Sequence, residues 1–374
     1  MSYESIKSNF IDNTKSKIFL DESGSSISRF DKLKYKMVDR LTEEQLSFFW
    51  RPEEINLLKD QKDYRSLQAN EQHIFSSNIK RQIVLDTIQA KNPSLAFIPL
   101  VTLPEMESWL TTWSFSESIH SRSYTHIIRN VYSDPSIIFD DIMNNKEIVE
   151  CSHDISEHYD ELINYTNMYN YLGEGNHVVN GKLVEVSKYE LKKKIWLCIN
   201  SVNVLEGIRF YVSFACSFAF AELKKMEGNA KIIRFICRDE NLHLGSTQML
   251  LKLLPKDDAD FAKIAKECEP EVIALFHKAI EQEKTWAEYL FKDGSMIGLN
   301  AKLLADYVDY IGQRRMEAIG LVNHKPKANP LPWTQKWISS ETVQVAAQEV
   351  ENSSYRVGDA VLDVSDDSFK KYSL

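Results

Sequence analysis

Apolar residues recur at helical spacing along most of this chain. Within residues 69–90, for example, Phe75, Ile79 and Ile83 lie one turn apart on the same face. Residues that interrupt helices are few, because the 374 residues include only 12 Gly and 10 Pro. The pattern predicts an all-α protein with long helices over residues 31–49, 69–90, 102–131, 146–172, 187–225, 229–254, 259–291 and 301–320.

The stretch around Asn180-Gly181 breaks this helical pattern. β-branched residues alternate with other residues on both sides of the pair, and Asn-Gly is a strong signal for a tight hairpin turn. We therefore expect one small β-hairpin near residues 177–186. The polar composition of both ends predicts three parts of the chain: an N-terminal arm over 1–30, a helical domain over 31–338, and a flexible, extended C-terminal tail over 339–374.

Composition narrows the partners and the location that we expect. The formal charge of −9 argues against general nucleic-acid binding, which needs clustered positive charge. The five cysteines form no Cys-x-x-Cys pair, which fits a reducing compartment. The chain shows no signal-peptide pattern at its start and no apolar run long enough to cross a membrane. We expect a cytoplasmic protein with neither a nucleic-acid nor a membrane partner.

Candidate chemistry appears first on the helix expected over 102–131. Glu117, His120 and Tyr124 lie at positions i, i+3 and i+7, so they share one face. Trp113 and Leu110 continue that face with apolar side chains. Burying a carboxylate, an imidazole and a phenol on an apolar stripe is costly unless something compensates. A bound metal would compensate the carboxylate and the imidazole.

Three further acids extend this pattern to other helices. Glu240 and His243 form a second Glu-x-x-His pair on an apolar stripe, and Asp86 and Glu206 each interrupt a stripe of their own. A single Glu-x-x-His often arises by chance on an exposed helix. Two copies on apolar stripes are harder to explain in that way.

Together, four helices contribute one carboxylate each, and two of them add a histidine at i+3. This is the ligand set of ferritin-like bundles that hold two iron or two manganese ions. Oxygen-rich ligands with one imidazole per metal suit such ions, and the cations would offset the burial of four negative charges. For Asp86 or Glu206 alone, a salt bridge to a buried arginine such as Arg209 or Arg234 is an alternative. We expect a ferritin-like bundle with additional helices and a metal site formed by Asp86, Glu117, His120, Glu206, Glu240 and His243.

Tyr124 distinguishes this site from a simple metal store. Its Cα should lie about 6 Å beyond that of His120 along the helix axis, near the metals without being an obligatory ligand. Phe210, Phe214 and Ile236 lie one or two turns from the predicted ligands of their own helices, so they would enclose the phenol. The alternative is an ordinary core tyrosine among packed aromatic rings. Beside oxidised metal, a dry pocket would instead protect a tyrosyl radical.

Six motifs of this chain resemble those of one family, the radical-bearing small (β) subunit of class I ribonucleotide reductase. The resemblance is closest to the class Ia enzymes of bacteria and their phages, and it covers residues 27–374. The motifs occur in the family's order at residues 46–54, 113–124, 123–130, 202–214, 238–243 and 348–355.

The resemblance implies an oxo-bridged pair of iron ions, with manganese also possible. The first metal would be bound by Asp86, Glu117 and His120. The second metal would be bound by Glu206, Glu240 and His243, with Glu117 bridging the two. Tyr124 would hold the stable radical that forms when the reduced metals react with dioxygen.

The resemblance also implies a long-range radical-transfer route. Trp50 and Asp239 would belong to it, and Asp239 would accept a hydrogen bond from His120. Tyr355 in the tail would relay the radical to the large subunit, assisted by Glu349. Without the family, these residues are interpreted as a packed tryptophan, a surface aspartate and residues of a disordered tail.

The implied protein is a homodimer that works with a large (α) subunit, which it binds through its C-terminal tail. The complex would reduce ribonucleoside diphosphates to deoxyribonucleoside diphosphates for DNA synthesis, with thioredoxin or glutaredoxin as reductant. A small protein or a flavin would supply electrons for metal reduction. The sequence shows no nucleotide-binding glycine motif, in agreement with substrate sites on the large subunit. A ferritin-like iron-binding protein and a two-electron oxidase or desaturase are the alternatives.

Two positions depart from the family's pattern. Gly207 follows Glu206 where the family has alanine, so we expect a helix loosened by up to ~1 kcal/mol beside a ligand. Lys370 and Lys371 make the tail less acidic than is usual in the family.

Overall fold

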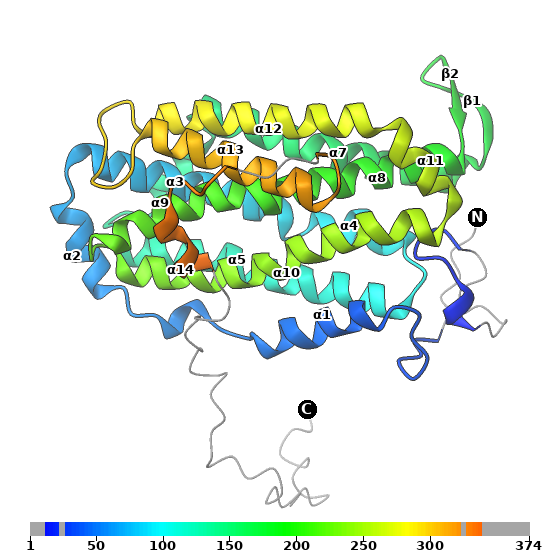
Figure 1. Cartoon of the computed structure of the whole chain (residues 1–374), viewed down its shortest axis with the longest axis horizontal. Helices are drawn as coiled ribbons and strands as arrows, with labels where there is room; N and C mark the ends of the chain where they lie inside the picture. The colour runs from blue at the N-terminus through cyan, green and yellow to red at the C-terminus, as the bar shows by residue number, and fades with distance from the viewer. Residues whose placement is uncertain (1–11, 22–26, 323–326, 339–374) are drawn as a thin grey trace, which may run out of the picture.

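The computed structural model describes residues 12–21, 27–322 and 327–338 and consists almost entirely of helices (Figure 1). The longest helices are α3 (Ala69–Gln89), α5 (Pro104–Val131), α7 (Lys146–Leu172), α8 (Lys188–Val204), α9 (Phe210–Glu222), α10 (Glu227–Asp257), α12 (Glu269–Leu290) and α13 (Ala301–Ala318). The shorter helices are α1 (Lys36–Ser47), α2 (Leu58–Ser66), α4 (Asn92–Phe97), α6 (Ser136–Asp141), α11 (Ala259–Glu267) and α14 (Gln335–Ile338).

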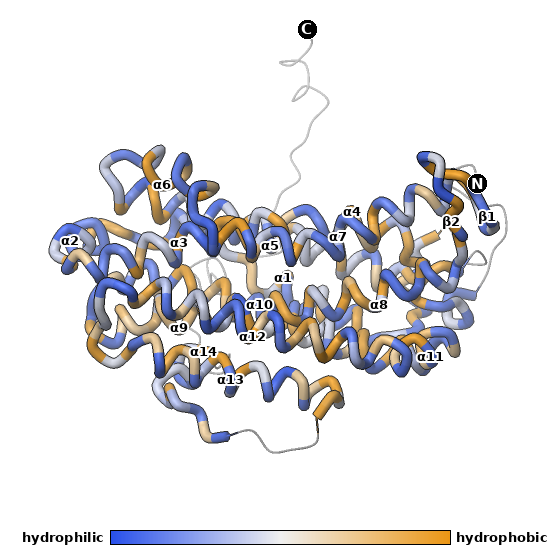
Figure 2. The backbone as a smooth tube through the Cα atoms, turned by 90° about the horizontal axis from the view of Figure 1, so that it is seen from above, coloured by the Kyte–Doolittle hydropathy of each residue, from blue (hydrophilic) through white to orange (hydrophobic). Residues whose placement is uncertain are grey.

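The centre of the bundle is formed by α3, α5, α10 and the continuous run from α8 to α9. These helices lie along the long axis of the molecule, and each contacts its neighbours in the set (Figures 1 and 2). Helix α1 packs against α5, α7 packs against α3 and α8, and the pair α12–α13 covers a further side. The buried apolar side chains form one continuous core. The predicted all-α bundle with additional helices is confirmed.

The predicted hairpin is also confirmed, and it extends two residues further than expected. Strand β1 (Gly175–Val179) pairs antiparallel with β2 (Lys182–Val186), with Val179 opposite Lys182. Asn180 and Gly181 form the turn and both have positive φ, +50° and +75°. A tight turn of this kind requires that conformation, and Asn and Gly adopt it at least cost. The hairpin projects from one end of the bundle (Figure 1).

Several predicted helix boundaries were wrong. Pro255 does not end α10, which continues two residues beyond it to Asp257. The helix expected over 259–291 is two helices, α11 and α12, which meet at Cys268 with Pro270 in the first turn of α12. Helices α2, α4, α6 and α14 were not predicted. Helix α1 begins at Lys36 rather than residue 31.

The helix expected over 187–225 contains a π-helical turn, Leu205–Arg209, between α8 and α9. The expectation that no apolar run is long enough to cross a membrane was wrong for residues 188–222, which are long and apolar enough by composition. The most apolar window of this segment is, however, completely buried within the bundle. It is therefore the central core helix. Most other helices alternate hydrophilic and hydrophobic stretches, as expected for helices with one face on the core (Figure 2).

Residues 12–21 of the N-terminal segment pack firmly on the bundle. Phe19 is buried, and its neighbour Leu20 donates a backbone hydrogen bond to the carbonyl of Leu100 at 2.9 Å. The backbone N–H of Ile18 donates to a carboxylate oxygen of Asp257 at 2.7 Å. This segment therefore closes one end of the helical core.

Candidate metal centre

Six acidic and histidine side chains meet in the middle of the bundle. Helix α3 contributes one, α5 two, the π-helical turn one and α10 two, and all six are fully buried. The helical periodicity explains their direction, because each lies on the apolar face that its helix turns to the core. They are the six predicted ligands Asp86, Glu117, His120, Glu206, Glu240 and His243.

Within the described residues, these side chains form two overlapping groups, each with potential ligand atoms within 4.8 Å of one another. The first group adds Asp86 and His120 to a shared pair of glutamates, and the second adds Glu206 and His243 to the same pair. The shared pair is Glu117 and Glu240. The resemblance implied one bridging residue, Glu117, whereas the geometry gives Glu240 an equivalent position between the groups.

The contacts between histidines and glutamates show how tightly the groups interlock. His243 Nδ1 lies 2.9 Å from a carboxylate oxygen of Glu117 and 2.9 Å from one of Glu240. His120 Nδ1 lies 3.1 Å from Glu117 and 3.2 Å from Glu240. Both imidazoles therefore turn the same nitrogen to the same two carboxylates. A cation placed there would meet one imidazole and several carboxylate oxygens.

Two acids of this cluster, Asp86 and Glu206, have carboxylate oxygens without the hydrogen bonds that buried carboxylates normally make. Neither oxygen of Asp86 has a hydrogen-bond partner among the described residues, and one oxygen of Glu206 also lacks one. Burial raises the pKa of Asp86 to about 8 and the pKa of Glu206 well above its usual range. Such groups are costly in a protein interior unless a positive charge neutralises them. The donor set and the unsatisfied oxygens fit two divalent cations.

The alternative of isolated salt bridges does not describe Glu206. Arg209, on the same π-helical turn, donates to Glu283 at 3.1 Å and to Gln282 at 2.6 Å. The oxygen of Glu206 that has a partner accepts instead from the side-chain amide of Gln89.

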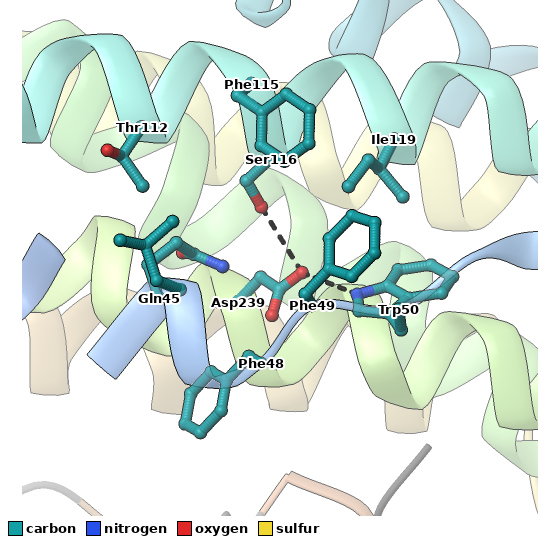
Figure 3. Close-up of a pocket in the computed structure, with 10 residues that line it drawn as sticks. Gln45, Phe48, Phe49, Trp50, Thr112, Phe115, Ser116, Ile119 and Asp239 are labelled. Carbon is teal, nitrogen blue, oxygen red and sulfur yellow. Dashed lines mark hydrogen bonds between the residues drawn. The ribbon is translucent and has the colours of Figure 1, made fainter. Parts of the chain in front are cut away.

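Asp239 connects the cluster to the surface side of α1 and α5. His120 Nε2 lies 3.0 Å from Asp239 Oδ2, and the indole N–H of Trp50 donates to the same oxygen at 2.9 Å. The hydroxyl of Ser116 also faces this oxygen at 3.3 Å. Figure 3 shows Asp239, Ser116 and Trp50 among the residues that line a pocket, together with Phe48, Phe49 and Phe115. The hydrogen bond expected between His120 and Asp239 is present.

Tyr124 lies in the core one turn beyond His120. Its side chain is fully buried, and its hydroxyl has no hydrogen-bond partner in the described part of the chain. Burial, reinforced by the charge of Asp86, raises the pKa of this phenol well above its usual value. The three residues expected around it are also buried, and two of them, Phe210 and Phe214, stack with ring centroids 5.8 Å apart. The phenol therefore sits in the core close to the acids.

Tyr355 and Glu349, the predicted tail residues of the radical route, lie outside the described residues. Lys370 and Lys371 lie there too.

Sequence reasoning missed several polar residues that hold the predicted ligands. The Gln89 amide contacts Glu206, and its carbonyl oxygen accepts from the hydroxyl of Tyr159 at 2.7 Å. The indole of Trp113 donates to Glu117 at 2.7 Å, and Gln45 lies 3.2 Å from His243. Gln89 could have been recognised from the sequence, because it lies three residues after the predicted ligand Asp86.

Gly207 has a packing role that the sequence did not reveal. A Cβ at this position would lie 3.0 Å from the Leu244 side chain and 3.1 Å from that of Arg315. The Arg315 side chain donates to the Gly207 carbonyl at 2.9 Å. Glycine therefore lets α13 approach the π-helical turn beside Glu206, whereas the sequence had suggested only a loosened helix.

Comparisons with known proteins point to one family. The family described as "Ribonucleotide reductase, small chain" matches residues 28–330. The chain is 52% identical to ribonucleoside-diphosphate reductase 1 subunit beta of Escherichia coli O157:H7, over the full length of both proteins. It is also 52% identical to ribonucleoside-diphosphate reductase subunit beta of Haemophilus influenzae, again over both full lengths. The chain belongs to the ribonucleotide reductase small-chain family.

The fold agrees with a solved relative. The R2 subunit of ribonucleotide reductase from Clostridium botulinum superposes with a TM-score of 0.74 at 24% identity, over 90% of this chain and 99% of the relative. The ferritin-like fold is therefore confirmed. As a class I ribonucleotide reductase small subunit, the chain acts in ribonucleoside-diphosphate reduction together with a large subunit. The storage-protein and two-electron oxidase alternatives are set aside.

Proposed function

We propose that this small subunit binds two iron ions in the buried cluster and uses them to generate a stable radical on Tyr124. The observation that supports this most directly is the pair of overlapping ligand groups, which share Glu117 and Glu240. Asp86 and His120 would complete one metal position, and Glu206 and His243 the other. Manganese fits the same oxygen-rich donors, so iron is the first choice for reconstitution and manganese the second.

When bound, the metal pair would react with dioxygen and supply the oxidising power for the phenol. The protein determines which side chain loses an electron. Oxidation of Tyr124 removes one electron and one proton from its hydroxyl. Burial makes a charged phenolate unfavourable at this position, as the raised pKa indicates. A neutral radical carries no such penalty, and the surrounding apolar core excludes water and reductants from it.

The hydrogen-bonded residues Trp50, Asp239 and His120 would form the inner part of the radical-transfer route. Asp239 Oδ2 receives the indole N–H and faces the imidazole, so one carboxylate oxygen joins the two rings. Such a carboxylate also fixes the orientation of a ligand imidazole. Tyr355, assisted by Glu349, would continue the route to the large subunit.

The working form would be a cytoplasmic homodimer, with residues 31–338 as the metal-binding domain and residues 1–30 as an N-terminal arm. Residues 339–374 would bind the large subunit. A small protein or flavin would supply electrons for metal reduction.

The test is reconstitution of the metal-free protein with ferrous iron, followed by exposure to air. We expect two irons per chain and a tyrosyl radical signal in low-temperature electron paramagnetic resonance (EPR). Protein grown with ring-deuterated tyrosine should show a narrower signal, which identifies the radical as a tyrosine. Two bound irons with ferric signals alone would overturn the radical proposal.

A further inference from the structure

A hydrogen-bonded chain leads from the metal centre to α7, a helix that contributes none of the predicted ligands. The side-chain amide of Gln89 donates to Glu206, and the hydroxyl of Tyr159 on α7 donates to the carbonyl oxygen of the same amide at 2.7 Å. Gln89 lies on α3 and Glu206 on the π-helical turn, and α7 packs against both α3 and α8. No step of the proposed function involves Tyr159.

All members of this chain are shielded from solvent. Gln89 and Glu206 have no exposed surface, and Tyr159 is only 1% exposed. A buried amide costs free energy unless both its carbonyl oxygen and its NH2 group have hydrogen-bond partners. Gln89 has one protein partner for each group, so the two contacts hold the amide between α7 and the predicted ligand.

The two ends of the Gln89 amide are not interchangeable. The nitrogen can only donate and the oxygen can only accept, and an ionised carboxylate can only accept. Metal ligands must be deprotonated, so a metal-bound Glu206 requires the NH2 end of the amide. If the amide were reversed, its oxygen would face the carboxylate with no hydrogen between them. Both orientations have nearly the same shape, so apolar packing does not select between them.

Tyr159 selects between the two orientations. Its hydroxyl donates to the carbonyl end of Gln89, which turns the NH2 end toward Glu206. Burial raises the pKa of this phenol well above its usual value, so the hydroxyl keeps the proton that it donates. The ring is held separately by an edge-on contact with Phe97, with 6.3 Å between the ring centroids. The hydroxyl can therefore be removed while the packed ring is kept.

We propose that Tyr159 is a positioning residue for the metal centre. By fixing the orientation of the Gln89 amide, it directs a hydrogen bond to Glu206 and sets the affinity of the metal position that Glu206 completes. The inference rests on the proposed function, because it requires that the cluster bind two metals. The chain does not include Asp86 or His120, so the effect belongs to one of the two positions.

Titration of the metal-free protein with Mn²⁺ in the absence of dioxygen tests this role with the metal alone. Tyr159→Phe removes the hydroxyl and keeps the ring. We expect the affinity of one position to fall about three- to tenfold, less than is typical when a residue that contacts a ligand directly is lost, and the affinity of the other to stay unchanged.

EPR of the same samples shows which positions are filled. When less Mn²⁺ is added than both positions can bind, Tyr159→Phe should contain more isolated ions and fewer coupled pairs than the wild type. A purely structural role for Tyr159 would weaken both positions alike and leave that ratio unchanged. That result would overturn the inference, as would a Tyr159→Phe protein with the wild-type affinities.

Tyr211→Phe is the matched control. Tyr211 is also buried, and its hydroxyl also donates to a side-chain amide oxygen, that of Asn241. The NH2 group of Asn241, however, donates to the backbone carbonyl of Ile338 and not to a predicted ligand. This variant should bind Mn²⁺ with the wild-type affinity at both positions. A loss equal to that of Tyr159→Phe would contradict the proposed role.

Two further variants show whether Tyr159 acts through Gln89. Added to Gln89→Leu, Tyr159→Phe should cause no further loss of affinity, because the amide that it orients is already gone. Additive losses would overturn the inference. Para-aminophenylalanine at position 159 supplies another N–H donor at the same place and should restore the wild-type affinity.

The para-aminophenylalanine variant also carries the test if Tyr159→Phe does not fold. In that case, an affinity as low as that of Gln89→Leu would overturn the inference. A wild-type protein that binds fewer than two metal ions per chain, iron or manganese, would overturn the proposed function instead.

Discussion

The indole N–H of Trp50 donates to Asp239 Oδ2 at 2.9 Å, although the two residues are 189 positions apart in the chain. Both side chains are buried, and the same carboxylate oxygen lies 3.0 Å from the imidazole of His120. A buried link of this kind joins the surface side of α1 to the centre of the bundle. A variant that lacks this link should still form the Tyr124 radical but should not use it in nucleotide reduction.

Trp50→Phe keeps an aromatic ring but removes the indole N–H, which donates the hydrogen bond to Asp239. We expect normal iron binding and a normal Tyr124 radical, with loss of reductase activity when the large subunit is added. Radical EPR and a nucleotide reduction assay measure the two properties in one preparation. Trp286→Phe is the control, because this buried indole N–H has no partner in the described structure. Full activity of Trp50→Phe would exclude the route.

The amide of Gln89 should tune the metal position at Glu206. Gln89→Leu removes the donor to Glu206 and leaves the Tyr159 hydroxyl without its acceptor. We expect metal affinity at this position to fall about 10- to 100-fold, as is typical when a residue that orients a ligand is lost. Titration of the metal-free protein with ferrous iron measures the effect.

Gln82→Leu is the matched control for that titration. Gln82 is fully buried on the same helix, and its amide atoms have no partner among the described residues. Its replacement should leave metal affinity unchanged. Equal losses in the two variants would show that the effect is one of general packing.

Metal binding should release protons near neutral pH. Burial raises the pKa of Asp86 to about 8, so at pH 7 this carboxyl is largely protonated before metal arrives. Burial alone would lower the pKa of His243, but Glu117 and Glu240 raise it to about 9, so this imidazole is protonated too. Metal ligands must be deprotonated. Affinity should therefore fall as pH falls from 9 to 6.

Calorimetry in buffers of different ionisation enthalpy counts the protons released. We expect more than one proton per chain at pH 7. A binding enthalpy that is the same in all buffers would contradict the proposed state of the metal-free cluster.

A separate buried ion cluster should hold the π-helical turn in place. Glu283 accepts from Arg81 at 2.7 Å and from Arg209 at 3.1 Å, and Arg209 belongs to the turn that contains Glu206. Glu283→Gln leaves two buried guanidinium groups without their counter-charge. We expect the free energy of unfolding to fall by about 3–5 kcal/mol.

Denaturant unfolding of the metal-free protein measures this loss. Asp306→Asn supplies the comparison, because it removes a solvent-exposed ion pair with Lys302 on α13. That variant should lose no more than about 0.5 kcal/mol. Similar losses in both variants would mean that the buried cluster contributes no more than a surface pair.

The predicted ligands could be found from the sequence because their signal is local. Glu117 and His120 share one helix face by spacing alone, and the same holds for Glu240 and His243. The apolar residues around each pair then indicated burial. The equivalent position of Glu240 between the two groups was not visible, because it depends on how α5 and α10 align with each other.

Other features depend on contacts between helices and could not be predicted. The π-helical turn lies where Arg315 of α13 donates to the carbonyl of Gly207. No local sequence pattern indicates that these two segments lie close together. Gln45 contacts His243 across 198 positions of sequence. Pro255 also shows the limit of local rules, because α10 continues past this proline to Asp257.

The central claim is that the cluster serves Tyr124. Low-temperature EPR of iron-reconstituted Tyr124→Phe, beside the wild type and with iron content measured in the same samples, tests it most directly. We expect two irons per chain in both proteins, with a tyrosyl radical in the wild type and none in the variant. A persistent tyrosyl radical of full intensity in Tyr124→Phe would contradict the claim.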